Sequence, residues 1–328
     1  MMGTPLPPTQ VLVIGGGMSG LSAAATLEQR GIPFLVLEAK THSGGRMHAI
    51  RFGDPAVGQR MIETGANWIQ GGSPNPMFQM AKTLGLRTAF ERFGDAPSVY
   101  DEAYDSQGRL VSHMGRTGFL EGPVNACLTL RAQGLAAQGA GRDESVREGL
   151  NKCGWTVNES SADTALEFLY YTAEYAVSPS RTSLRHNEPD PQYEWNEPDD
   201  YFVVDQNERG FAAVADALTL SPDDSRLVMN AEVAQITSTA DRVIVTLANG
   251  TTLEAAAAIV TVPVGVLNAA DGIRFNPPLP KVQARALAKY TMGNFSKVHM
   301  QWRETFWRPQ VRPSNLTHTS KVTGRSEF

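Results

Sequence analysis

A glycine-rich turn near the N-terminus restricts the possible folds of this chain more than any other feature. Residues 11–14, VLVI, form a short apolar run typical of a buried parallel strand, and GGGMSG follows directly. Residues 21–31 then place apolar side chains at helical spacing, with Gly31 as a stop signal. Residues 34–38, FLVLE, have the composition of a second strand. This order predicts a β-α-β unit in a parallel sheet.

Gly15, Gly17 and Gly20 have the spacing of the dinucleotide-binding fingerprint. The first glycine permits a tight turn, the second lets the backbone approach a pyrophosphate, and the third packs the helix against the strand. The helix N-terminus offers unpaired N–H groups and a positive dipole end to phosphates. Glu38, at the end of the second strand, is placed to accept hydrogen bonds from ribose hydroxyls. The pattern predicts a dinucleotide site, and a plain glycine-rich turn is the alternative.

A second glycine pair follows Glu38, in the sequence Ser43-Gly44-Gly45-Arg46. Two glycines let the chain run close to a ligand, and the Arg46 guanidinium offers two parallel donors to a pyrophosphate. This stretch favours FAD over NAD as the dinucleotide. The alternative is a plain turn with a surface arginine.

The later part of the chain predicts a nucleotide-binding domain interrupted by an insertion. Residues 227–255 have the pattern of short strands and turns, with Asn249-Gly250 as a hairpin signal, and residues 257–267 follow as a buried strand leading into a turn. We expect an α/β fold in which a discontinuous, Rossmann-like FAD-binding domain with a β-meander is joined to an α+β substrate domain that is incomplete at its C-terminus. The expected ranges are 1–85 and 200–272 for the FAD-binding domain, 86–199 and 273–312 for the substrate domain, and 313–328 for a disordered tail.

Composition excludes several classes of function. The net charge of −5 argues against a nucleic-acid-binding protein, and no apolar run is long enough to span a bilayer. Cys127 and Cys153 have no metal-ligand spacing and make no disulfide framework, so we expect no metal and a reducing compartment. No basic stretch followed by an apolar one opens the chain, and its C-terminus is no peroxisomal signal. We therefore expect an intracellular, cytoplasmic protein.

Seven motifs in order resemble those of the flavin-containing amine oxidases, and most of all the polyamine oxidases. They are GGGMSG, LEAKTHSGGRMH, ETGANWIQG, RGF (209–211), NAEVAQI, VTVPVGVLN and NFSKVHMQWRETFW. The resemblance runs from residue 10 to residue 308 with a poorly matching middle. It implies a C-terminally truncated member of the family.

The resemblance also implies which residues hold FAD. The AMP and pyrophosphate parts would contact Gly15, Gly17, Ser19, Gly20, Glu38, Ala39, Gly45 and Arg46. The flavin ring and ribityl chain would lie along Gly65, Ala66, Asn67 and Trp68. Val233 would contact the adenine through its backbone, although the residues alone indicate only a core valine in a strand.

By resemblance, the protein oxidises the C–N bond of a polyamine-type amine, as in polyamine catabolism. A hydride passes to flavin N5, the imine hydrolyses, and O2 reoxidises the flavin to give H2O2. Residues 295–307 read as a strand, with Lys297, His299 and Gln301 on one face. Lys297 matches the family's active-site lysine, and burial against a flavin would lower its pKa. The alternative is a strand lysine with its amine in solvent.

Three further residues would face the amine substrate: Glu174, Gln70 and Trp68. A carboxylate at Glu174 would hold a distal ammonium group, and the alternative is a glutamate on a helix surface. Gln70 departs from the family pattern, because polyamine oxidases carry an acid there and an amide holds no charge. Residues 188–200 form an acidic run that would attract a polycation, although such a run is more often a solvated loop.

Two other classes of protein remain open at this point. One is a non-catalytic remnant of the family that keeps the fold without turnover. The other is an NAD(P)-dependent dehydrogenase, against which Ser43–Arg46 and the segment around Lys297 argue. The expected partners are a small amine and O2, and the oligomeric state is left open.

Overall fold

The computed structural model describes residues 10–91, 103–104, 110–111, 118–139, 143–157, 162–173, 175–186, 200–204, 209–221 and 224–304. The chain divides into two compact units. The first, here called the sheet unit, comprises Met1–Trp68, Met77–Thr88 and Phe202–Met292. The second, here called the helical unit, comprises Ile69–Pro76, Ala89–Tyr201 and Gly293–Phe328.

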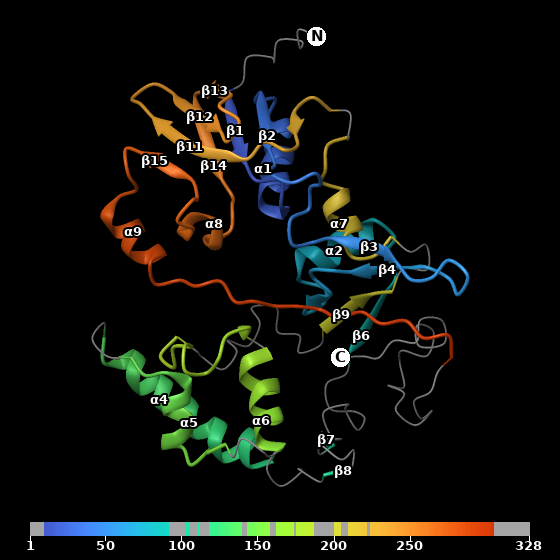
Figure 1. Ribbon diagram of the computed structural model, residues 1–328, viewed down its shortest axis with the longest axis vertical. Helices are drawn as coiled ribbons and strands as arrows, with labels where there is room; N and C mark the ends of the chain where they lie inside the picture. The colour runs from blue at the N-terminus through green and yellow to red at the C-terminus, as the bar shows by residue number, and fades with distance from the viewer. Residues whose placement is uncertain are drawn as a thin grey trace. The chain divides into compact units, whose positions relative to one another are not determined.

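A four-stranded parallel sheet lies at the centre of the sheet unit (Figure 1). Its strands are β1 (Val11–Ile14), β2 (Phe34–Leu37), β10 (Leu227–Val228) and β14 (Ala257–Val260), in the order β10-β2-β1-β14. The helix α1 (Met18–Gln29) connects β1 to β2, and Gly31 follows it with a φ of 65°. The predicted β-α-β unit is therefore confirmed. The side chains of β1 and β2 are buried throughout, as expected for central parallel strands.

The strand β14 pairs in parallel with β1, but it is not the buried strand that the sequence predicts. Ile259 is 36% exposed and Val260 is 37% exposed. The physical reason is position, since β14 is an edge strand of this sheet in the described part of the chain. An apolar run alone does not distinguish an edge strand from a central one.

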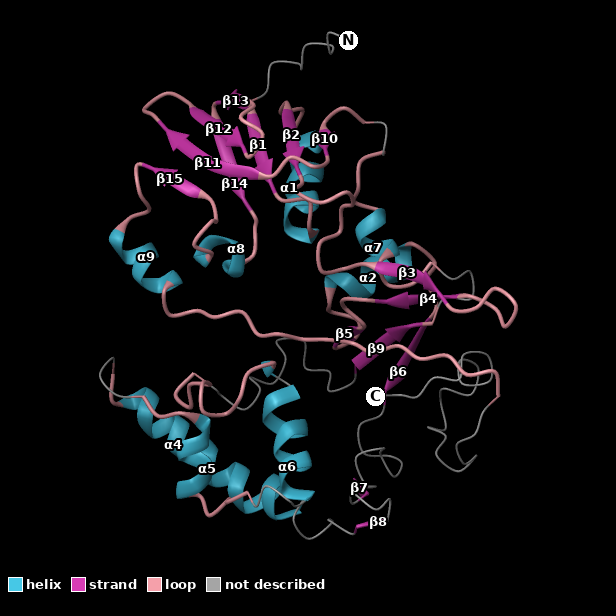
Figure 2. Cartoon of the chain, viewed as in Figure 1, coloured by secondary structure: helices cyan, strands magenta, loops and turns pink. Residues whose placement is uncertain are grey.

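A second sheet of the same unit has the order β13-β12-β11-β15 (Figure 2). The strands β11 (Val233–Ser238), β12 (Val243–Leu247) and β13 (Thr252–Ala255) form an antiparallel meander, and Gly250 turns the last hairpin with a φ of 86°. The hairpin predicted at Asn249-Gly250 is confirmed. The strand β15 (Arg274–Asn276) pairs in parallel with β11, so this sheet extends past the domain boundary expected at residue 272.

The remaining strands and helices, apart from the helices that form the core of the helical unit, are short. Residues 209–219 read as one helix, but only α7 forms, because Gly210 has a φ of 69° and turns the chain before it. The strands β5, β9 and β6 form a three-stranded sheet in that order, and β3 pairs with β4 and β7 with β8. The bounds are β3 (Ala49–Phe52), β4 (Arg60–Glu63), β5 (Trp68–Gln70), α2 (Pro76–Thr83), β6 (Thr88–Glu91), β7 (Ala103–Tyr104), β8 (Leu110–Val111), β9 (Asp200–Val203), α7 (Ala213–Asp216), α8 (Val264–Asn268) and α9 (Lys281–Leu287).

The core of the helical unit is built from side chains on five helical segments. A π-helical turn η2 (Leu120–Val124) leads into α4 (Asn125–Ala137), and α5 (Val146–Lys152) begins with a capping box formed by Ser145 and Glu148. The helix α6 (Ala162–Glu167) continues into a second π-helical turn, η3 (Phe168–Ala173). Their apolar side chains surround Trp155, which is fully buried.

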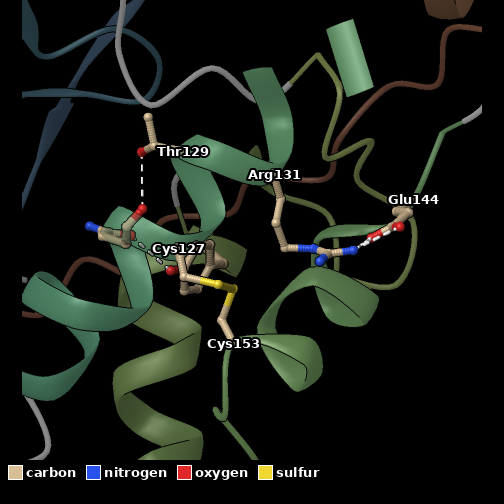
Figure 3. Close-up of a disulfide and its surroundings, with 7 residues drawn as sticks. Cys127, Thr129, Arg131, Glu144 and Cys153 are labelled. Carbon is tan, nitrogen blue, oxygen red and sulfur yellow. Dashed lines mark hydrogen bonds and ion pairs between the residues drawn. A yellow bond between two sulfur atoms is a disulfide. The ribbon is translucent and has the colours of Figure 1, made fainter. Parts of the chain in front are cut away.

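A disulfide joins Cys127 on α4 to Cys153, which caps the C-terminus of α5 (Figure 3). The expectation that these cysteines make no disulfide is therefore wrong. Spacing along the chain carries no information on this pair, because the packing of α4 against α5 brings the two Cα atoms to 5.8 Å.

The predicted strand at residues 295–307 is also wrong over its described part, 295–304. Residues 290–302 form neither helix nor strand, and 305–328 lie outside the described residues, as does the expected tail. The acidic run is outside as well, except for Asp200 in β9. A strand needs a pairing strand beside it, and none of the sheets formed by the described residues includes this segment. Within the described residues, no helix is long and apolar enough to cross a membrane.

Candidate functional site

The glycine turn between β1 and α1 is closed by contacts that only glycine permits. Gly15 has a φ of 107°, in the left-handed region, and its N–H donates to the Leu37 carbonyl at 2.8 Å. A Cβ on Gly20 would lie 1.9 Å from the Gly15 carbonyl oxygen, so no side chain fits there. The Thr261 hydroxyl donates to the Ile14 carbonyl at 2.8 Å and fastens the turn to the residue after β14. The start of α1 is thereby held against the ends of the parallel strands.

The second glycine pair lies directly against the first. The Gly44 N–H donates to the Gly16 carbonyl at 2.8 Å, and Gly17 forms a backbone bridge with Gly44. A Cβ on Gly45 would come within 3.1 Å of the Gly17 Cα. Two loops that the sequence presents separately therefore meet at the N-terminus of α1. Backbone N–H groups and a helix dipole at such a place suit a pyrophosphate.

Glu38 is the buried acid of this region, with 8% of its surface exposed. Its Oε2 accepts from the Gly16 N–H at 2.6 Å, and its Oε1 accepts from the Lys40 N–H at 2.8 Å. The carboxylate thus fixes the glycine turn to the end of β2. Each oxygen has a second lone pair, so the group keeps the capacity to accept from a hydroxyl.

The ETGAN stretch continues this chain of backbone contacts. The Ala66 N–H donates to the Arg46 carbonyl at 3.1 Å, and a Cβ on Gly65 would lie only 1.7 Å from that oxygen. Glu63, the first residue of this stretch, accepts a hydrogen bond from the Phe211 N–H. Residues 15–20, 44–46, 63–66 and 209–211 are therefore connected in series, although they are far apart in the sequence.

Val233 is 8% exposed and lies in the apolar core at the start of β11. The segment before it runs beside the end of β2: the Ala231 N–H donates to the Glu38 carbonyl at 2.8 Å, and the Asn230 N–H donates to the Lys40 carbonyl at 3.0 Å. The backbone before Val233 is thus next to the acid expected to bind a ribose. Its predicted contact with adenine stays a prediction.

Other predicted cofactor and substrate residues present their side chains to solvent. Ser19 in the first turn of α1, Ala39 and Arg46 are exposed, while Asn67 is half-buried. Trp68 is 39% exposed, and its ring lies 5.3 Å from that of Phe202. Along β5 the burial alternates, so Gln70 shares the exposed face of Trp68.

Two titratable groups flank the second glycine pair. The His48 Nδ1 lies 3.0 Å from the Thr64 hydroxyl, and its ring centroid is 4.3 Å from that of His42. The pKa of His48 is lowered, first by burial and then by His42 and Lys40, while Asp216 opposes the shift. Burial raises the pKa of Asp216, which favours its protonated form. Neutral His48 is thus the preferred form beside the Ser43–Arg46 loop.

Lys297 was predicted to be the active-site lysine and Glu174 to bind the substrate. Both belong to the helical unit. Lys297 is half-buried, whereas Glu174 lies outside the described residues. Their chain neighbours touch, because the Asn294 N–H donates to the Ala176 carbonyl at 3.2 Å. A Cβ on Gly293 would lie 2.8 Å from the Ala176 Cβ. Ala176 itself has a φ of 52°, which an alanine adopts only under the constraint of its surroundings.

Sequence reasoning missed Glu63 and Thr261 in the sheet unit and Ala176 in the helical unit. Glu63 and Thr261 bind backbone groups of distant segments, and Ala176 carries an unfavourable backbone conformation at the contact with residues 293–294. An acid just before the ETGAN glycine was a usable signal for Glu63. No local pattern marks the other two, because their roles depend on neighbours distant in the sequence.

The parallel sheet, the glycine turn at its end and the buried Glu38 characterise a dinucleotide-binding protein. Residues 18–327 match the family described as flavin containing amine oxidoreductase. Since the match covers most of the chain, the protein belongs to this family.

Its relatives include plant polyamine oxidases. The chain is 32% identical to polyamine oxidase 7 of Oryza sativa subsp. japonica over 91% of this chain and 64% of that protein. It is 31% identical to polyamine oxidase 1 of Zea mays, over 91% of this chain and 61% of that protein. A lysine-specific histone demethylase 1 homolog 2 from the same rice is 28% identical over 92% of this chain and 38% of its own length. The chain thus spans less than two thirds of the relatives it matches.

The family confirms the expected cofactor, FAD. The residues present fit this group, because two glycine loops meet at the N-terminus of α1, a place that suits a pyrophosphate, and Glu38 keeps acceptor capacity beside them. The alternative of an NAD(P)-dependent dehydrogenase is set aside by the family match. The predictions for individual cofactor and substrate residues stay predictions.

Proposed function

We propose that this protein is an FAD-dependent oxidase of polyamine-type amines, with O2 as the electron acceptor and H2O2 as a product. Family membership and the names of its plant relatives support the reaction class. When bound, FAD supplies a two-electron acceptor at N5 for the hydride leaving the carbon next to the amine nitrogen, and the resulting imine hydrolyses. The protein supplies binding, orientation and exclusion of water.

The observation that carries the proposal is the contact between the Asn294 N–H and the Ala176 carbonyl. It holds the segment before Lys297 against the residues that follow Glu174, within one compact unit. In the sequence, Glu174 lies two positions before Ala176 and Lys297 lies three positions after Asn294. This closeness to the contact supports roles for both residues toward one elongated amine.

The proposed roles follow from side-chain chemistry. Glu174 would bind a distal ammonium group of the substrate by charge, and Gln70 would accept a hydrogen bond without adding charge. Trp68, with its exposed ring, would offer an apolar wall to the methylene chain. Lys297 would hold an ordered water where the reduced cofactor meets O2. The substrate nitrogen must lose its proton before the carbon next to it can release a hydride equivalent. A cationic lysine near that nitrogen would disfavour the ammonium form of the substrate.

The test is anaerobic mixing of the purified, flavin-loaded protein with spermine or N-acetylspermine. Loss of the oxidised-flavin absorbance, and its return on admission of air with H2O2, is the expected result. Bleaching by simple monoamines but not by either polyamine would overturn the substrate class and leave amine oxidation in place. Bound flavin that no amine bleaches would favour a non-catalytic member of the family.

Lys297→Met tests the role of the lysine separately from binding of the cofactor. The variant should keep its flavin and lose about 10-fold or more in flavin reduction or in reoxidation by O2. Lys289→Met, which changes an exposed lysine in the turn after α9, is the matched control and should leave both rates unchanged. Equal rates in Lys297→Met and the control would remove Lys297 from the mechanism.

A further inference from the structure

The disulfide in the helical unit involves none of the residues assigned to the cofactor or the amine. Cys127 is in the first turn of α4 and Cys153 follows the last residue of α5 (Figure 3). Both residues are half-buried, and they are the two cysteines of the chain. The bond closes a loop over a sequence separation of 26 residues.

An ionic cross-link runs beside the covalent one. Arg131, one helical turn after Cys127, donates to Glu144 with Nη2–Oε2 at 2.7 Å, and the Lys152 Nζ lies 2.7 Å from Oε1 of the same carboxylate. Only 10% of the Glu144 side chain is exposed. Two bonds of different kinds therefore connect α4 to the segment that contains α5.

The surroundings of Cys153 favour a stable disulfide over a reactive thiol. Cys153 lies at the C-terminus of α5, where the helix dipole disfavours a thiolate. The nearby Lys152 amine is bound to Glu144. A redox-sensing cysteine needs the opposite, namely an electropositive place that stabilises the thiolate. Among the described neighbours of Cys153, the helix end and the paired lysine therefore do not favour a thiolate that would react with peroxide.

We propose that Cys127–Cys153 is a structural cross-link of the mature protein, made when the chain folds in an oxidising compartment. The bond forms by thiol–disulfide exchange with a protein disulfide. Each cysteine thiol loses a proton, the pair gives up two electrons, and the donor disulfide leaves as two thiols. Such bonds persist in secretory, periplasmic and extracellular environments and are reduced in a cytosol. This proposal replaces the cytoplasmic location expected from the sequence, and it does not depend on the proposed function.

The first test is alkylation of the unfolded protein, purified from its natural source under acid quench. Without a reductant, no cysteine should react with iodoacetamide, and after reduction both Cys127 and Cys153 should react. Fractionation of the same source should place the protein outside the cytosol. Protein found in the cytosol with two free thiols would overturn the proposal.

The second test measures what the bond does to each unit. Closing a loop of this length should shift the unfolding equilibrium on the order of 100-fold. Hydrogen exchange followed by mass spectrometry should show that dithiothreitol speeds exchange in peptides from α4 and α5 but leaves β1 and α1 unchanged. The Cys127→Ser, Cys153→Ser variant should match the reduced protein and not respond to dithiothreitol.

The reduced wild-type chain keeps this test decisive if the double variant fails to fold. Equal exchange in α4 and α5 before and after complete reduction would show that the bond does not stabilise the helical unit and would overturn its structural role. Glu144→Gln is the matched control, because it removes the ionic cross-link and keeps the disulfide. It should still respond to dithiothreitol.

Discussion

The sheet unit and the helical unit achieve the same result, the joining of distant segments, by different means. In the sheet unit, the glycine turn, the second glycine pair and the ETGAN stretch meet backbone to backbone, with glycines where a Cβ would collide. In the helical unit, a disulfide, two ion pairs to Glu144 and the buried Trp155 connect the helices through side chains. Backbone contacts leave N–H groups facing a ligand, whereas side-chain contacts stabilise a scaffold.

This difference predicts opposite results for the same substitution in the two units. Gly20→Ala would place a Cβ 1.9 Å from the Gly15 carbonyl oxygen, so the turn must shift. We expect a loss of stability of about 3 kcal/mol and loss of bound flavin. Gly134→Ala, in α4 with nothing within 4 Å of its Cβ, should stabilise by about 0.5–1 kcal/mol. Thermal unfolding and flavin content measure both; equal losses in the two variants would contradict the comparison.

Trp155→Phe examines the side-chain connections of the helical unit. It removes the indole N–H that donates to Glu167 Oε2 at 3.3 Å and leaves a void in a fully buried position. The expected loss is about 2–3 kcal/mol, with flavin affinity unchanged. Leu130→Ala changes a residue of α4 that is 71% exposed, and it should change stability by less than about 0.5 kcal/mol. Loss of flavin in the tryptophan variant would show that the two units are not independent.

Gly293→Ala tests whether a close backbone contact that requires glycine, as in the sheet unit, also positions a segment of the helical unit. The new Cβ would meet the Ala176 Cβ at 2.8 Å. This clash should displace the segment that leads from residue 293 to Lys297. Turnover should fall by about 10- to 100-fold while bound flavin is retained. Ala176→Gly relieves the left-handed backbone instead and should stabilise by about 1 kcal/mol. An alanine at 293 with normal turnover would remove any positioning role from this contact.

Acid should weaken the helical unit through Glu144. Hydrogen bonds from Lys152, and then from Arg131, hold the pKa of Glu144 below its ordinary value of 4.5. A lowered pKa in the folded state contributes stability above pH 4.5, and this contribution is lost as the pH falls through the folded pKa. Stability followed by hydrogen exchange in α4 should drop in that range, and in Glu144→Gln the drop should be smaller. An identical acid response in both proteins would assign the effect to other groups.

Elements encoded by local pattern were predictable, and contacts between them were not. The β-α-β unit and the Asn249-Gly250 hairpin were confirmed, because apolar spacing and turn residues act within a few positions. Residues 295–304 show the limit of this reasoning. Val298 is 77% exposed and Met300 is 47% exposed, although alternation puts both on an apolar face opposite Lys297. Alternation predicts a strand only where a neighbouring strand and a covering layer exist.

The site divides in the same way. Residue type and spacing were enough to indicate a dinucleotide and an acid at the end of β2, because glycine and carboxylate chemistry acts locally. The flavin family was indicated by the resemblance of seven motifs. Other contacts were decided only by the tertiary structure. The two oxygens of Glu38 accept hydrogen bonds from the backbone N–H groups of Gly16 and Lys40. Gly45 lies against Gly17, and Cys127 is bonded to Cys153. The contacts of Glu38 with Gly16, of Gly45 with Gly17 and of Cys127 with Cys153 join residues from 22 to 28 positions apart. The contact of Glu38 with Lys40 is local, but it forms only once the strand β2 is in place. Such proximity depends on packing and leaves no periodic trace in the sequence.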